Sequence, residues 1–306
     1  MQALTPLDTV LDHLKQIADE TRNSDGDVKC KRALVDRYFA AHPSCLESNA
    51  DCTTVEGPGF SGVWVTADGS DPGMRLLYIH GGSWMAGSPK GYQGHAARIS
   101  QVTRCSVLLI DYPLTPESPF PEGLNSCVDA FKWMANNGPD GESPARSRCI
   151  AGDSAGGNLA LASLLKLKAE NEILPQAAVV LSPATDLAFA TDSMHSKKPE
   201  DPVINPDFMP FITRLYLGDE ALVDNPLASP LRGDLEGLPP LLIQTGSAEV
   251  LLDDSTAFAR KAISQGSHVE IEIWPRMPHV FQGFAPFLPE AVKALERISQ
   301  FTAHYL

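Results

Sequence analysis

The chain has 306 residues, of which 43% are hydrophobic, 20% are charged and 7% are aromatic. This composition is too apolar for an intrinsically disordered chain and allows a large buried core. The formal net charge of −14 disfavours binding to nucleic acids and anionic membranes and favours neutral or cationic partners. No apolar run reaches the roughly 18–20 residues that span a bilayer, and the start lacks a signal-peptide pattern, so we expect a cytoplasmic protein without a membrane span.

The six cysteines lie in the first half of the chain, without CxxC pairs or the Cys/His spacing of a zinc site. They predict neither a disulfide scaffold nor a metal site. Most are expected to be buried thiols, whereas Cys45 and Cys52 lie in a polar stretch and are candidates for exposure.

The N-terminal region predicts one or two amphipathic helices between residues 5 and 41. Apolar residues recur there at helical spacing, namely Leu7, Val10, Leu11, Leu14 and Ile17, followed by Val35, Tyr38 and Phe39. Residues 43–60 are rich in Pro, Gly and polar residues, and we expect a loop there.

After residue 60, short apolar runs alternate with helical patterns. The expected strands are Val63–Thr66, Met74–Ile79, Ser106–Asp111, Arg148–Ala151, Ala177–Ser182, Leu241–Thr245 and Glu270–Trp274. The expected helices are Gly91–Gln101, Cys127–Asn136, Gly156–Lys168, Ser255–Gln265 and Pro289–Tyr305. Several strands are apolar at consecutive positions, which is typical of parallel strands covered on both faces. We therefore predict an α/β fold with a doubly wound, mostly parallel sheet flanked by helices.

Residues 186–236 interrupt this alternation. The segment is proline-rich and longer than a crossover connection requires. Its short helical pattern consists of Phe208, Phe211, Ile212, Leu215 and Tyr216. Long insertions of this kind are usually lids, binding elements or disordered segments.

The pentapeptide Gly-Asp-Ser-Ala-Gly at residues 152–156 is the most informative motif. It follows the expected strand Arg148–Ala151 and precedes an expected helix, which is the strand–turn–helix context of a nucleophile elbow. A tight turn lifts the serine above the sheet edge, and the small neighbours allow strand and helix to approach closely. We therefore predict that Ser154 is a catalytic nucleophile.

A second loop, His80-Gly81-Gly82-Ser83-Trp84, directly follows the expected strand Met74–Ile79. Adjacent glycines at the end of a strand allow backbone N–H groups to face a ligand. An oxyanion hole in this fold combines such a loop with the N–H that follows the nucleophile. We predict Gly81, Gly82 and Ala155 as the donors.

A nucleophilic serine needs a histidine base and a carboxylate that orients it, in the chain order serine, acid, histidine. Of the later histidines, His268 lies beside an expected strand and His304 lies in the C-terminal tail, whereas His279 follows the strand Glu270–Trp274 in a loop. A base in that loop can reach the catalytic edge of the sheet. We therefore choose His279.

The acid is expected in the loop after the strand Leu241–Thr245. Glu249 lies near the end of the strand, whereas Asp253 and Asp254 have the position of residues at a helix N-terminus. We favour Glu249 and keep Asp253 as the alternative. The triad prediction is thus Ser154, Glu249 and His279.

In this order, HGGSW, DYPLTPESPFPE, GDSAGG, SAEVLLDDS and MPHVF make the chain resemble the bacterial hormone-sensitive-lipase family of esterases, in its GDSAG branch. The resemblance extends from about residue 60 to the C-terminus. It implies an α/β-hydrolase fold in which a helical cap, residues 1–45 and 186–236, covers a catalytic core of residues 46–185 and 237–306. It also implies a cofactor-free, metal-free serine carboxylesterase, and many family members form homodimers.

Three positions depart from the pattern of the family. Glu249 stands where the family more often has aspartate, Ser83 replaces the third glycine of HGGG, and Pro113 replaces an arginine. The first departure concerns the triad acid, and the other two concern the pocket and its supporting contacts.

The expected reaction is hydrolysis of small neutral esters with short- to medium-chain acyl groups, through an acyl-enzyme on Ser154. A lactone, amide or carbamate substrate would use the same triad, because specificity depends on the pocket. A non-catalytic small-molecule receptor is a third reading, but such relatives typically lose a triad residue. Candidate pocket walls are Trp84, Phe208, Phe211 and Val280.

Overall fold

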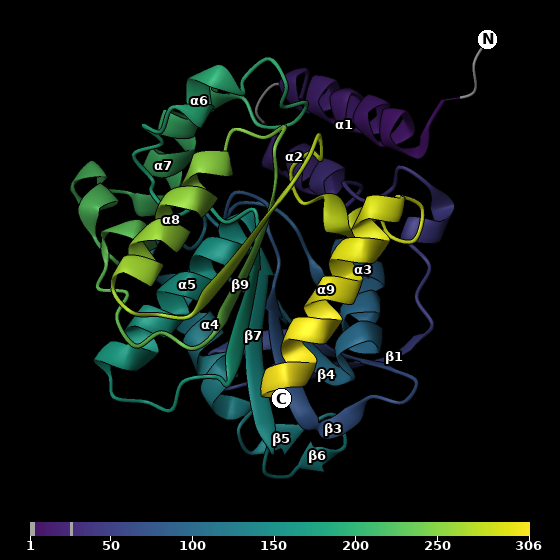
Figure 1. The fold of residues 1–306 in the computed structure, drawn as a ribbon, viewed down its shortest axis with the longest axis vertical. Helices are drawn as coiled ribbons and strands as arrows, with labels where there is room; N and C mark the ends of the chain where they lie inside the picture. Colours follow the sequence, from purple (N-terminus) through teal and green to yellow (C-terminus); the bar gives the residue numbers. More distant parts are fainter. Residues whose placement is uncertain (1–3, 25–26) are drawn as a thin grey trace.

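A mixed sheet of eight strands forms the centre of the computed structural model, which describes residues 4–24 and 27–306. In spatial order the strands are β1 (Ala50–Gly57), β2 (Phe60–Ala67), β4 (Cys105–Asp111), β3 (Asp71–Ile79), β7 (Ser147–Asp153), β8 (Ala177–Leu181), β9 (Leu241–Gly246) and β10 (Val269–Trp274) (Figure 1). The pairs β1–β2 and β2–β4 are antiparallel, and the other pairs are parallel. A separate two-stranded hairpin consists of β5 (Asn137–Gly138) and β6 (Gly141–Glu142).

Both faces of the sheet are buried, which explains why the central strands are apolar at consecutive positions. In β4, Leu108 and Ile110 belong to one hydrophobic core, whereas Val107 and Leu109 belong to the other. This alternation follows from the two-residue period of a strand, because each face receives every second side chain. The predicted mostly parallel α/β sheet is confirmed.

Helices cover the two faces of the sheet (Figure 1). One face packs against α4 (Glu122–Trp133), α5 (Ser154–Ala169) and α8 (Leu252–Ser264). The other face packs against α3 (Pro89–Thr103) and α9 (Pro289–Tyr305). Helix α5 is apolar on nearly all sides and almost fully buried, as expected for a helix enclosed between the sheet and other elements.

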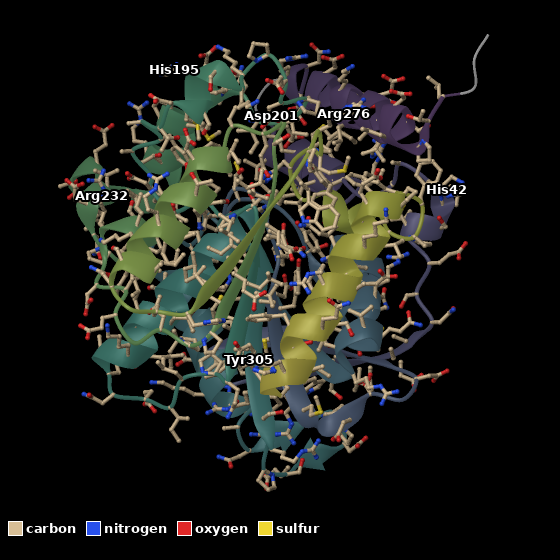
Figure 2. The ribbon with its side chains drawn as sticks, in the orientation of Figure 1. His42, His195, Asp201, Arg232, Arg276 and Tyr305 are labelled. Atoms are coloured by element: carbon tan, nitrogen blue, oxygen red, sulfur yellow. The ribbon has the colours of Figure 1, made fainter. Side chains whose placement is uncertain are left out.

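Two segments far apart in the sequence lie at the end of the sheet where the parallel strands finish. The N-terminal segment contains α1 (Pro6–Arg22), α2 (Val28–Val35) and the short η1 (Pro43–Cys45). The insertion, residues 186–236, contains α6 (Ser193–Ser196), η2 (Pro206–Phe208), α7 (Met209–Leu217), η3 (Glu220–Asp224) and η4 (Pro230–Arg232). His195 on α6 marks this end of the molecule and Tyr305 on α9 lies far from it (Figure 2).

The seven strands expected from the sequence are present, but one expectation for the preceding region is wrong. Residues 43–60 were expected to form a loop, and Ala50–Gly57 instead form the edge strand β1. Most of its residues are exposed and polar, so no apolar pattern marks it. Its hydrogen bonds to β2 define the strand, and such pairing cannot be read from the polar sequence alone.

The N-terminal region forms two helices, within the expected range of residues 5–41. Thr5 and Asp8 make a reciprocal capping box at the start of α1, and the Asp27 side chain caps α2. Four core helices begin earlier than expected, since α3 starts at Pro89, α4 at Glu122, α5 at Ser154 and α8 at Leu252.

The six cysteines are free thiols. Cys52 is exposed as expected and Cys30 is also exposed. The expectation that Cys45 is exposed is wrong, because the side chain packs beneath η5 (Phe281–Phe284), where its Sγ lies 3.3 Å from the Phe284 carbonyl oxygen.

The turn at Ser154 depends on close contact between α5 and β3. A Cβ atom at Gly156 would collide with the backbone carbonyls of Ile79 and His80. We predict that Gly156→Ala lowers the free energy of unfolding by about 3 kcal/mol or more, because the backbone cannot retreat cheaply. Urea unfolding measures this loss.

Gly237→Ala is the control for this prediction. Gly237 has a positive φ of 69°, and no atom lies near its Cβ position, so only backbone strain of about 1 kcal/mol is expected. Equal losses in the two variants would contradict the contact argument.

Candidate active site

The residues singled out in the sequence converge at one edge of the sheet. Ser154 follows β7, the His80–Trp84 loop follows β3, Glu249 follows β9 and His279 follows β10. Parallel strands that end side by side bring their following loops together, which is the usual position of ligand sites in open α/β sheets.

Ser154 occupies a strained turn between strand and helix. Its φ is +54°, in the left-handed region that is unfavourable for residues with a side chain. It is also the first residue of α5, so the positive end of the helix dipole lies beside its hydroxyl. The side chain is partly exposed and lines a cavity, as a reactive group must.

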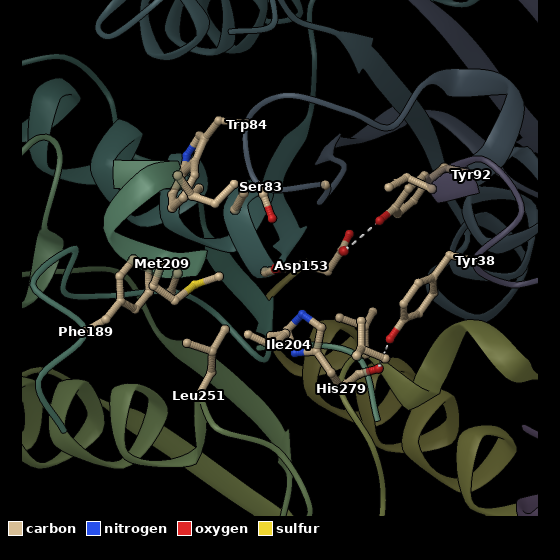
Figure 3. Close-up of a pocket in the computed structure, with 18 residues that line it drawn as sticks. Tyr38, Ser83, Trp84, Tyr92, Asp153, Phe189, Ile204, Met209, Leu251 and His279 are labelled. Atoms are coloured by element: carbon tan, nitrogen blue, oxygen red, sulfur yellow. Dashed lines mark hydrogen bonds between the residues drawn. The ribbon is translucent and has the colours of Figure 1, made fainter. Parts of the chain in front are cut away.

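His279 and Glu249 form a buried pair beside this cavity. The Nδ1 atom of His279 lies 2.5 Å from Oε2 of Glu249, and both side chains are almost completely removed from solvent. The Tyr38 hydroxyl donates a 2.7 Å hydrogen bond to the backbone carbonyl of His279 (Figure 3). His279 is therefore held by its ring and by its backbone.

The other carboxylate oxygen of Glu249 is also fully engaged. Its Oε1 accepts hydrogen bonds from the hydroxyl of Ser182 at 2.7 Å, the hydroxyl of Thr245 at 2.7 Å and the N–H of Gly246 at 2.6 Å. A buried carboxylate keeps its charge only when such donors replace water. These contacts make Glu249 an ionised, immobile partner for His279.

Burial and pairing act in opposite directions on this pair. Burial favours the neutral forms, but the charge and hydrogen bond of His279, with the hydroxyls of Ser182 and Thr245, hold the pKa of Glu249 below its ordinary value. Burial likewise opposes protonation of His279, and the nearby carboxylate of Glu249 outweighs it, so the pKa of His279 is raised. The carboxylates of Asp201 and Asp153 act on His279 in the same direction as Glu249.

The two other acidic candidates have different partners. Asp253 accepts a 2.8 Å hydrogen bond from the N–H of Ser193. Asp254 accepts hydrogen bonds from the N–H groups of Thr185 and Asp186, at 2.8 and 3.2 Å, and its burial raises its pKa to about 7. Of the three candidate acids, the structure brings Glu249 to His279.

The glycine loop differs from the expectation at one donor. The N–H of Gly81 donates to Oδ1 of Asp153 and to the Tyr92 hydroxyl, each at 3.2 Å. It therefore points toward the Asp153 side chain, next to the turn that carries Ser154. Gly82, Ser83 and Ala155 line the cavity. The N–H of Gly81 is therefore already occupied, which disagrees with its prediction as an oxyanion donor. Ser83, which the sequence placed at the pocket without a role, lines the cavity. The third position of the loop, where the family has glycine, was the available signal.

Asp153, the residue before the nucleophile, was not singled out from the sequence. Its buried carboxylate accepts a hydrogen bond from the hydroxyl of Tyr78 at 3.0 Å. It accepts a second one from the hydroxyl of Tyr92 at 2.9 Å (Figure 3). Burial raises its pKa to about 6, although these hydroxyl donors lower it. The carboxylate anchors the glycine loop, through Gly81, to the end of β7.

The cavity has a mainly apolar lining. It is bounded by Val35, Tyr38, Gly82, Ser83, Trp84, Tyr92, Asp153, Ser154, Ala155, Ala184, Phe189, Val203, Ile204, Met209, Ile212, Leu251, His279 and Val280. Trp84 is fixed by stacking on Tyr216, with ring centroids 4.5 Å apart. The N-terminal segment and the insertion both contribute walls, as Tyr38 and Met209 illustrate (Figure 3).

Two of the four expected pocket walls lie elsewhere. Trp84 and Val280 line the cavity, but Phe208 and Phe211 are about half exposed, at 52% and 48%, and do not. Met209 and Ile212, also three residues apart, line it instead. The helical period explains the correction, because residues one position apart point about 100° away from each other.

Within residues 4–24 and 27–306, no group of three or more His, Cys, Asp or Glu side chains is arranged to hold a metal ion. None of the helices in the same ranges is long and apolar enough to cross a membrane. The two other late histidines, His268 and His304, lie in a separate shallow depression with Glu270 and Arg297.

Comparison with known proteins agrees with this geometry. A family model described as an alpha/beta hydrolase fold matches residues 76–283. An acetyl-hydrolase from Streptomyces hygroscopicus is 38% identical over 277 residues, which cover 90% of this chain and 89% of that protein. An esterase from Acinetobacter venetianus is 34% identical over 226 residues, which cover 74% of this chain and 73% of that protein.

Solved structures extend the comparison to the whole chain. The crystal structure of an esterase from the bacterial hormone-sensitive lipase family matches with a TM-score of 0.91 and 35% identity, over 100% of this chain and 99% of that one. The fold and its site thus define an α/β hydrolase that cleaves ester bonds. The chain belongs to the hormone-sensitive lipase family of esterases.

The buried pair predicts a specific pH dependence of stability. Since the pKa of Glu249 is lowered from 4.5, its contribution is present above that pH and is lost as the pH falls through the folded-state pKa. Since the pKa of His279 is raised from 6.5, its contribution is present below that pH and is lost as the pH rises through the folded-state pKa. We predict that Glu249→Gln loses most stability relative to wild type between about pH 4.5 and 6.5.

Urea unfolding of wild type and Glu249→Gln across the pH range measures this difference. Glu56→Gln, on the exposed edge strand β1, is the control and should show a flat difference. A destabilisation by Glu249→Gln that does not change with pH would contradict the ion-pair account.

Proposed function

We propose that this esterase hydrolyses short- to medium-chain acyl esters through an acyl-enzyme on Ser154, with His279 as the base and Glu249 as the orienting acid. The observation that carries the proposal is the buried 2.5 Å contact between His279 and Glu249 beside a serine with a φ of +54°. Nucleophile, acid and base thus follow β7, β9 and β10 at one edge of the sheet, in the required chain order.

The proposed reaction starts when His279 Nε2 removes the proton of the Ser154 hydroxyl and Oγ attacks the ester carbonyl carbon. Glu249 keeps the Nδ1 proton of His279 in place and stabilises the imidazolium that forms. The imidazolium then protonates the departing alcohol, and a water activated by the same base hydrolyses the acyl-enzyme. Ser154 and His279 both line the cavity, and catalytic hydrogen bonds often tighten only when substrate is bound.

The oxyanion of the tetrahedral intermediate is proposed to be held by the N–H groups of Gly82, Ser83 and Ala155. These residues line the cavity beside Ser154, whereas the N–H of Gly81 is already bonded to Asp153. A donor of this kind contributes about 2.7–4 kcal/mol to transition-state stabilisation. Gly81 is proposed to hold the loop in the shape that presents the other donors.

The apolar lining supports an uncharged substrate. Residues such as Trp84, Phe189 and Met209 offer surface for an acyl or alcohol group and no cation to pair with an anionic substrate. The net charge of −14 also disfavours anionic esters. The name of the Streptomyces hygroscopicus relative, an acetyl-hydrolase, supports a preference for short acyl groups.

We further propose that residues 1–45 and 186–236 form the cap and that the remaining residues form the catalytic core, within the GDSAG branch of the family. Cavity walls from both segments, such as Val35 and Ile212, support this division, and residues 1–3 and 25–26 lie outside the described residues. The free state of all six cysteines supports a reducing, cytoplasmic location. The partly exposed edge strand β10 supports a homodimer.

We predict that Ser154→Ala lowers kcat for p-nitrophenyl butyrate by about 10⁴-fold or more, because no other group can form the acyl-enzyme. A stopped-time absorbance assay measures the loss. Wild type should also be labelled covalently by a fluorophosphonate and Ser154→Ala should not. Substantial turnover by the variant would refute the assignment of the nucleophile.

A panel of p-nitrophenyl esters, from acetate to decanoate, tests the substrate class. We predict that kcat/KM for acetate and butyrate exceeds that for decanoate by about tenfold or more. A lactone, a carbamate and p-nitroacetanilide in the same panel test the other substrates of the same triad. A higher kcat/KM for decanoate or for one of these compounds would overturn the proposed preference.

A further inference from the structure

Asp201, in the insertion, holds two parts of the active site together through its carboxylate. Its Oδ1 accepts hydrogen bonds from the N–H of Val203 at 2.8 Å and the N–H of Ile204 at 2.9 Å. Its Oδ2 accepts a 2.9 Å hydrogen bond from the N–H of Val250, 49 positions away in the chain. Figure 2 places Asp201 at the end of the molecule where the insertion and the N-terminal helices meet.

The three amides have direct connections to the site. Val203 and Ile204 line the cavity, and Val250 directly follows Glu249. The first two bonds shape the local turn, as aspartate commonly does. The third bond is not local, and it joins the cavity wall to the loop of the orienting acid.

The charge of Asp201 also acts on His279. The carboxylates that raise the pKa of His279 come from three parts of the fold: Glu249 after β9, Asp201 in the insertion and Asp153 at the end of β7. Glu249 touches the ring, and Asp153 is bonded to Tyr78, Tyr92 and Gly81. Asp201 thus acts on His279 and is also hydrogen-bonded to the cavity residues Val203 and Ile204.

We propose that Asp201 is a positioning residue that couples the substrate-contacting wall Val203–Ile204 to the Glu249–His279 pair. This inference rests on the proposed roles of Glu249 and His279. Through its bond to Val250 it fixes the loop that carries Glu249, and its negative charge stabilises the imidazolium form of His279 during the reaction. Through its bonds to Val203 and Ile204 it fixes where the acyl or alcohol group lies.

Two substitutions separate these contributions. Asp201→Asn retains one carbonyl oxygen, so it can serve either the turn or Val250 but not both, and it removes the charge. Asp201→Ala removes all three hydrogen bonds. Asp253→Asn is the matched control. The Asp253 carboxylate also joins the insertion to α8, through the Ser193 N–H, but it accepts no hydrogen bond from Val203, Ile204 or Val250. Asp253→Asn keeps an oxygen for that N–H and leaves in place the separate bond from the Ser193 hydroxyl to the Val250 carbonyl.

The expected results are changes that a purely structural role would not produce. Asp201→Asn should lower kcat by about 3–10-fold, and Asp201→Ala should lower it further. The acid limb of the kcat/KM profile should move to lower pH by about 0.5 unit in both variants, since loss of the negative charge lowers the pKa of His279. The ratio of kcat/KM for butyrate over acetate should change by about threefold, whereas Asp253→Asn should keep all three quantities at wild-type values.

A second measurement does not depend on activity, and its decisive part uses only the wild-type protein. In wild-type protein, the amide hydrogens of Val203, Ile204 and Val250 should be protected from exchange with solvent. Asp201→Asn should lose protection either at Val203 and Ile204 or at Val250. Rapid exchange of the Val250 amide in wild type would overturn the proposal.

The kinetic measurements on the Asp201 variants can also overturn the proposal. Asp201 variants with wild-type kcat, acyl ratio and acid limb would do so, and so would identical changes in Asp253→Asn. Failure of the proposed function itself looks different, because Ser154→Ala would then retain activity whatever the Asp201 variants do.

Discussion

An ionised glutamate in the interior is the constraint around which this active site is built. Glu249 is completely buried, and a bare carboxylate there would cost several kcal/mol or would take up a proton. The protein supplies a donor from the end of β8, two from the end of β9 and the ring of His279 from the loop after β10. The relative positions of three strands are thus tied to one charge, and that charge keeps the histidine oriented and basic.

Ser154, the proposed nucleophile after β7, has a corresponding structural cost. Ser154 adopts a positive φ, and such strain persists only when the surroundings leave no alternative. Gly152 and Gly156 allow α5 to press against the end of β3, which enforces the turn. Asp153 then links the turn to the glycine loop through Gly81, so the nucleophile and the proposed oxyanion donors are positioned by a single residue pair.

The site also depends on segments outside the central sheet. Tyr38 reaches from the N-terminal segment to the carbonyl of His279, and Asp201 reaches from the insertion to the residue after Glu249. The N-terminal segment therefore contributes a wall of the cavity and a hydrogen bond to the loop of His279. The insertion contributes another wall and a hydrogen bond to the loop of Glu249. Short hydrogen-bonded connections thus join the cavity walls to the loops of Glu249 and His279.

The sequence by itself determined the strand and helix pattern of the core, the Ser154 turn and the choice of His279, because buried strands and tight turns impose local residue requirements. It favoured Glu249 from its place near a strand end, but only the tertiary structure brought Glu249 rather than Asp253 to His279. The polar edge strand β1, the inward amide of Gly81 and the outward faces of Phe208 and Phe211 were likewise decided by tertiary structure. The physical reason is the same in each case: these features depend on which distant backbone group or surface lies opposite, and no local pattern records that.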